Sequence, residues 1–96
     1  MSTRIEHDLL GDRAVPADAY WGVHTLRAVE NFPITGQTIA SYGDLIVALA
    51  QIKKAAALAN RDLGLLDEVR TRAIVAACEE LVEGKLHDQF VVDVYV

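Results

Sequence analysis

The chain has 96 residues, of which 52% are hydrophobic and 24% charged, and its formal net charge is -5. A chain of this length forms at most one small domain, and its acidic balance and scattered basic residues exclude a nucleic-acid footprint. No apolar run is long enough to span a bilayer, and the polar N-terminus is unlike a signal sequence, so we expect no membrane partner. A single cysteine cannot form an internal disulfide, which indicates a reducing, cytoplasmic location.

The first segment predicts a β-hairpin. Positions 4 to 15 contain an alternating stretch that is typical of a short strand, in which Ile5, His7 and Leu9 alternate with Glu6 and Asp8. Gly11-Asp12 is a plausible tight turn between them. We therefore expect two short strands that need a further packing surface, because an isolated hairpin is marginal.

A short helix is expected next. Asp18 can cap one helical turn, and Thr25 is a second candidate cap, for a helix that runs through Asn31. Pro33 excludes continuation of that helix beyond Phe32.

The middle of the chain predicts a long helix. Ser41 followed three places later by Asp44 resembles a capping box, and Gly64 is a typical stop signal. Between them, apolar residues recur at spacings of three and four, as on one face of a helix. This stripe consists of Leu45, Leu49, Ile52, Ala56 and Ala59.

A second helix is predicted between Asp67, a candidate N-cap, and Gly84, a candidate C-terminal glycine. Its apolar face consists of Val69, Ile74, Ala77, Cys78 and Leu81. Two helices joined by a short turn form an antiparallel helical hairpin. The expected fold class is mainly α: a short N-terminal β-hairpin followed by an antiparallel helical hairpin.

The helix faces and the last twelve residues suggest that this fold needs partners. Many face residues are alanines, which allow close helix approach but bury little area each, so we expect self-association of the isolated chain. Residues 85–96 are apolar and β-branched without a cap or terminal charge. Natural termini are usually polar and exposed, so we interpret 1–96 as part of an N-terminal domain.

Four segments together resemble the aspartase/fumarase superfamily, in the order and spacing of that family. They are the opening run Pro16–Phe32, the strand pair Glu6–Arg13, the helix centre Ile52–Asn60 and the segment Gly84–Phe90. The resemblance covers essentially the whole chain and implies the N-terminal portion of that fold.

Two details resemble the aspartate ammonia-lyases more than the class II fumarases of the superfamily. These are Val23-His24-Thr25 and Asp88-Gln89-Phe90 followed by Val-Val-Asp. This implies elimination of ammonia from L-aspartate to give fumarate in a cytoplasmic homotetramer, without cofactor or metal. The hydrogen-bond donors and the serine base of the family belong to blocks that this chain lacks. We therefore expect no catalytic residue here and no activity from the chain alone; a class II fumarase origin is the alternative.

Arg27 and His24 are the candidate residues for substrate or activator binding. A guanidinium binds a carboxylate through two hydrogen bonds, and the imidazole of His24 could line an anion-binding pocket. The structural alternative for Arg27 is an ion pair with Glu30 or a charge near the C-terminus of its helix, and for His24 a turn beside Gly22.

Other chemistry-bearing residues do not form a motif. The histidines His7 and His87 lack metal-ligand spacing, Cys78 lies on an apolar helix face, and Lys53-Lys54 fits a solvated face. The alternative outside enzymology is a small helical interaction module that binds a partner through its apolar faces.

Overall fold

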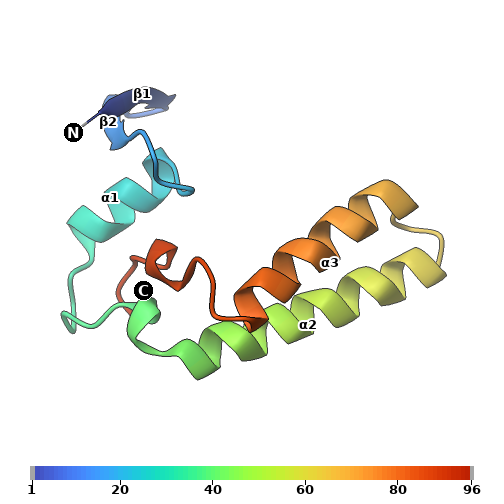
Figure 1. Cartoon of the computed structure of the whole chain (residues 1–96). Helices are drawn as coiled ribbons and strands as arrows, with labels where there is room; N and C mark the ends of the chain where they lie inside the picture. The colour runs from blue at the N-terminus through green and yellow to red at the C-terminus, as the bar shows by residue number, and fades with distance from the viewer. Residues whose placement is uncertain (1, 96) are drawn as a thin grey trace. The chain divides into compact units, whose positions relative to one another are not determined.

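A computed structural model describes residues 2–95. Along the chain follow β1 (Thr3–Asp8), β2 (Gly11–Pro16), α1 (Val23–Asn31), α2 (Gly43–Asp62) and α3 (Glu68–Val82), with 3₁₀ turns at Ile39–Ser41 and His87–Gln89 (Figure 1). The chain divides into two compact units: residues up to 41 together with those from 88 onward, and residues 42–87. The mainly helical fold class with one short β-hairpin is confirmed.

The β-hairpin turns at a different place from the one predicted. β1 and β2 pair antiparallel with Asp8 opposite Gly11, so the loop is Leu9-Leu10 and not Gly11-Asp12. The backbone N–H of Leu10 donates to Asp8 Oδ1 at 2.9 Å and closes the loop. Gly11 has φ of 116°, a conformation that favours glycine, so it serves as the first paired residue after the loop.

α1 begins without a side-chain cap of its own. Its N-cap is Gly22, whereas the expected caps Asp18 and Thr25 lie in a preceding turn and inside the helix. The first helical N–H, that of Val23, donates instead to Glu6 Oε1 on β1 at 2.8 Å. The carboxylate of Glu6, from another element, thus takes the place of a local cap. Its negative charge also interacts favourably with the positive end of the helix dipole.

The C-terminal segment of the first unit runs beside residues 37–40. The backbone N–H of Ala40 donates to the Phe90 carbonyl at 2.9 Å, and the N–H of Val94 donates to the Gln37 carbonyl at 2.9 Å. Thr38 and Asp93 form an isolated antiparallel bridge. The extended character expected for this segment is therefore realised as backbone pairing with a loop more than fifty residues away.

In the second unit, α2 and α3 run antiparallel as predicted (Figure 1). Each helix ends in a Schellman motif, in which the N–H of the third residue past the end bonds back to the last turn. The N–H of Leu65 donates to the Asn60 carbonyl at 2.8 Å, and that of Lys85 to the Glu80 carbonyl at 3.0 Å. The intervening glycines have φ of 75° (Gly64) and 93° (Gly84), which explains both stop signals.

The start of α3 follows the sequence signal and the start of α2 does not. Asp67 caps α3 by accepting from the Arg70 N–H at 2.7 Å. For α2 the predicted capping box of Ser41 and Asp44 is wrong, because Tyr42 is the N-cap and the helix has no side-chain cap hydrogen bond.

The packed face of α2 also differs from the predicted stripe. The residues of α2 buried inside the second unit are Ile46, Ala50 and Ala57, and those of α3 are Thr71 and Cys78. The predicted α2 stripe is one position out of register and is exposed. A helix with apolar residues on two faces gives a broad signal, so periodicity alone cannot say which face meets α3.

Candidate functional site

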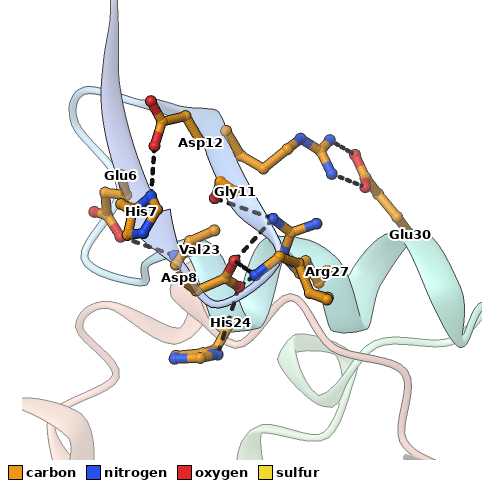
Figure 2. Close-up of polar contacts among 11 residues, drawn as sticks. Glu6, His7, Asp8, Gly11, Asp12, Val23, His24, Arg27 and Glu30 are labelled. Carbon is orange, nitrogen blue, oxygen red and sulfur yellow. Dashed lines mark hydrogen bonds and ion pairs between the residues drawn. The ribbon is translucent and has the colours of Figure 1, made fainter.

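Arg27 and His24 converge on one carboxylate, that of Asp8 (Figure 2). Both residues lie on α1, three positions apart and hence on the same side of the helix, while Asp8 is the last residue of β1. Arg27 donates from Nε to Asp8 Oδ2 at 2.7 Å and from Nη2 to Oδ1 at 2.9 Å. The His24 Nδ1 atom lies 4.0 Å from Asp8 Oδ2.

This arrangement holds Asp8 as a carboxylate. Hydrogen bonding from Arg27 lowers the pKa of Asp8 below its ordinary value; burial opposes this shift, and the bond from the Leu10 N–H adds to it. The Asp8 side chain is only 7% exposed and that of Arg27 17% exposed, whereas His24 is 89% exposed. The pair is therefore an inner link between β1 and α1, and His24 is its solvent-facing member.

The ion pair expected between Arg27 and Glu30 is wrong, because Arg27 pairs with Asp8. Glu30 pairs with Arg13 of β2, which donates from Nη1 to Glu30 Oε1 at 2.8 Å and from Nη2 to the other oxygen. Hydrogen bonding in this pair lowers the pKa of Glu30 and raises that of Arg13. Two Arg–carboxylate pairs thus fasten α1 to the β-hairpin (Figure 2).

A third link surrounds Arg4, which the sequence analysis did not single out. Its guanidinium donates to Glu6 Oε2 at 2.7 Å and to the Trp21 carbonyl at 2.7 Å. Further bonds reach the carbonyls of Pro16, Ala17 and Ala19 at 2.9–3.1 Å. Arg4 therefore fixes the loop from β2 to α1, the stretch that carries much of the family signature.

Glu6 completes this link, and its position explains why residue 22 is a glycine. Hydrogen bonds from Arg4 and from the Val23 N–H lower the pKa of Glu6. A Cβ on Gly22 would lie 2.6 Å from Glu6 Oε1. The glycine in the Trp-Gly pair thus leaves room for the carboxylate that caps α1.

The last polar cluster in the first unit gathers around Asp93, a buried carboxylate with 6% exposure. Its Oδ2 accepts from the N–H groups of Thr35 at 2.8 Å and Gly36 at 2.9 Å, and its Oδ1 accepts from the Tyr95 N–H at 2.9 Å. Burial acts to raise the pKa of Asp93, but the bonds from Tyr95, Thr35 and Gly36 outweigh it and the pKa is lowered. The donors lie up to 58 residues away, so no local signal could have identified this cluster.

A cavity of about 180 Å³ adjoins this cluster. It is lined by Val29, Pro33, Gly36, Thr38, Val91 and Asp93. Both oxygens of the carboxylate already accept backbone N–H groups, so the cavity offers a ligand mainly apolar contact.

Residues 2–95 form no metal-binding cluster. In that range no three His, Cys, Asp or Glu side chains gather as metal ligands, and Cys78 is buried on α3. None of the helices there is long and apolar enough to cross a membrane. In the first unit Arg4, Arg13 and Arg27 each pair with a carboxylate of that unit.

Comparison with known proteins places this arrangement in a family. A family model described as a lyase matches residues 11–96. The chain is 56% identical over 92 residues to the aspartate ammonia-lyase of Pseudomonas aeruginosa and 58% identical over 92 residues to the class II fumarate hydratase of Halobacterium salinarum. Each alignment covers 96% of this chain and 19% of the relative.

A solved structure agrees with these relatives. The crystal structure of a fumarate lyase:delta crystallin from Brucella melitensis has a TM-score of 0.86 and 51% identity, over 98% of this chain and 20% of that one. The chain belongs to the aspartase/fumarase family of lyases, as the sequence motifs predicted. It spans about a fifth of the length of the curated relatives that it matches.

Proposed function

We propose that this chain supplies the N-terminal part of an aspartate ammonia-lyase, which converts L-aspartate to fumarate and ammonia. The observation that carries the proposal is 53–56% identity to aspartate ammonia-lyases of several bacteria, over at least 94% of the chain. The aspartase-like Val23-His24-Thr25 and the Asp88–Asp93 segment add to it.

In the complete enzyme, a general base removes a proton from Cβ of aspartate, and hydrogen-bond donors stabilise the negative charge that develops on the carboxylate. We assign neither role to this chain. Its carboxylates and guanidinium groups hold β1, β2 and α1 together. A lyase that lacks both the base and the hydrogen-bond donors lacks all of its catalytic groups, which costs far more activity than the loss of a single interaction. The 96-residue chain alone is therefore inactive and acts as a structural part of a cytoplasmic homo-oligomer.

A binding role for Arg27 and His24 stays a proposal. Arg27 uses Nε and Nη2 for Asp8, so an incoming carboxylate would meet its Nη1 and the exposed imidazole of His24. In a complete enzyme, His24→Gln should then raise KM for L-aspartate, or weaken activation by an anion, without changing thermal stability. An unchanged KM and unchanged activation would remove His24 from the binding groups.

A class II fumarase is the second candidate, because the Halobacterium salinarum relative is 58% identical over the same length. Two matched hybrid enzymes separate the candidates. This chain replaces the aligned segment in the Pseudomonas aeruginosa aspartate ammonia-lyase and, separately, in the Halobacterium salinarum fumarase. Each hybrid is compared with its own unmodified parent. The proposal expects the larger retained fraction of kcat/KM in the ammonia-lyase; a larger fraction in the fumarase would favour the second candidate.

A further inference from the structure

The outer surface of the α2–α3 hairpin has one apolar side and one charged side. On α2 the buried residues are Ile46, Ala50 and Ala57, and they define the packed face of this helix. The predicted stripe centred on Leu49 and Ile52 points about 120° away from them, given about 100° of rotation per residue. Leu45, Leu49 and Ile52 are 41%, 44% and 64% exposed, and Ala56 and Ala59 are exposed as well.

α3 carries a matching stripe on the same side of the hairpin. Thr71 and Cys78 face α2, and Ile74, Ala77 and Leu81 lie about 80° from them in the same rotational sense as the stripe of α2. Each stripe is rotated about its own helix axis, in the same sense, away from the packed face. Because the two helices are antiparallel, these two rotations bring both stripes to the same side of the hairpin. We call the side formed by the α2 stripe and these three α3 residues the apolar side.

The ion pairs between the helices confirm this geometry independently. Lys54 Nζ lies 3.3 Å from Glu79 Oε1, and Arg61 Nε lies 4.0 Å from Glu68 Oε2. All four residues are displaced in the opposite rotational sense from the contact line, so they mark the other side.

Two charged residues interrupt or border the apolar side. Lys53 lies at its border on α2, and Arg70, near the start of α3, lies within the α3 stripe and pairs with Asp67 at 3.0 Å.

We propose that the apolar side is a docking surface for an apolar α-helix from the part of the lyase polypeptide outside these 96 residues. This inference rests on the proposed function. Leucine and isoleucine at spacings of three and four, beside alanines, form ridges and shallow grooves that accept another helix closely. Soluble proteins rarely leave so continuous an apolar strip uncovered, and the relatives carry about four fifths of their length beyond this segment. The ion-paired side remains toward water.

Neighbouring cysteine substitutions on α2 test the proposal. Ile52→Cys lies on the apolar side, and the matched control Gln51→Cys lies next to it in sequence but on the ion-paired side; both native residues are exposed. Each is placed in this chain alone and in the hybrid Pseudomonas aeruginosa enzyme. Reaction of the native proteins with a thiol reagent is followed by peptide mass mapping. Neither position is part of a catalytic or binding group.

The expected result is equal labelling of both cysteines in the isolated chain and at least tenfold slower labelling of Ile52→Cys in the hybrid. Equal labelling in an active hybrid would overturn the docking surface while leaving the proposed function intact. Slow labelling of Ile52→Cys in the isolated chain, together with the size of a dimer in solution, would show that a second copy of the chain covers the apolar side. That result would overturn the proposal that a helix from the rest of the lyase covers it. An unfolded or inactive hybrid would count against the proposed function and the inference together.

Discussion

Asp8 at the end of β1 and Arg27 on α1 are joined edge to edge by two hydrogen bonds of 2.7 and 2.9 Å, with both side chains largely shielded from water. The Arg27 Nη2 atom also lies 3.3 Å from the Gly11 carbonyl across the hairpin. A planar guanidinium satisfies this geometry and an ammonium does not. The residue singled out as an anion binder thus already holds an anion that belongs to the chain.

The Asp8–Arg27 link predicts a specific loss of stability. Asp8→Asn replaces a bidentate acceptor by a neutral amide and should lower Tm by several degrees. Asp12→Asn is the matched control, because Asp12 is an exposed hairpin carboxylate that pairs with the exposed His7, and it should leave Tm nearly unchanged. Thermal unfolding followed by circular dichroism measures both. Equal Tm values would mean that the link does not stabilise the first unit.

Acid should destabilise the folded chain from about pH 4 downward. The pKa values of Glu6, Asp8, Glu30 and Asp93 are all lowered on folding from ordinary values of 4.5 for Glu and 3.8 for Asp. Below those values the unfolded chain takes up protons more readily than the folded chain, so the free energy of unfolding falls as the pH falls toward the folded pKa values. The stabilisation is fully present near pH 7.

Asp93→Asn tests one part of this acid dependence. The variant should be less stable at pH 7, because an amide nitrogen cannot accept the N–H groups that Asp93 accepts on both oxygens. Its stability should also fall less steeply below pH 4. Asp88→Asn, an exposed change in the same segment, serves as control. Urea titrations at several pH values give both quantities; parallel pH profiles for native chain and Asp93→Asn would contradict the role of Asp93.

The contribution of the Asp67 N-cap to the free energy of unfolding can be predicted. Asp67→Ala removes the acceptor of the Arg70 N–H and should cost about 1 kcal/mol, as for other N-caps. Asp62→Ala, at the end of α2, removes a carboxylate that contacts only its neighbour Arg61 and should be neutral. Chemical denaturation of the two variants measures the difference. A cost for Asp62→Ala equal to that for Asp67→Ala would show a general charge effect and no cap.

The packed register of α2 predicts contrasting effects at adjacent positions. Ile46, 1% exposed, is in the core of the second unit, so Ile46→Ala should cost roughly 3 kcal/mol. Leu45→Ala removes an exposed side chain of the same size from the apolar side and should cost less than about 1 kcal/mol in the isolated chain. Urea denaturation of both variants decides which face meets α3, and a reversed order would restore the stripe expected from periodicity.

Local signals in the sequence predicted the second unit well. Gly64, Asp67 and Gly84 act through the backbone of their own turns, so a few residues suffice to recognise them. The packed face of α2 was missed because two faces of that helix are apolar and only the tertiary contact with α3 selects one.

The first unit depends on contacts that a local pattern cannot contain. Glu6 caps α1 from 17 residues away, and Asp93 holds Thr35 from 58 residues away. Arg27 was recognised by its chemistry, but its partner depends on the position of the hairpin end relative to α1. The sequence therefore singled out Arg27 but not its partner Asp8, nor the clusters around Arg4 and Asp93.

Aspartate turnover by the hybrid Pseudomonas aeruginosa enzyme that carries this chain tests the central claim most directly. Fumarate formation is followed by its ultraviolet absorbance, beside the unmodified enzyme and the isolated 96-residue chain. The account predicts that the hybrid retains kcat/KM within about tenfold of the unmodified enzyme, a difference of about 1.4 kcal/mol in the activation barrier, and that the isolated chain forms no fumarate. A folded hybrid without activity, or fumarate release by the purified chain alone, would contradict it.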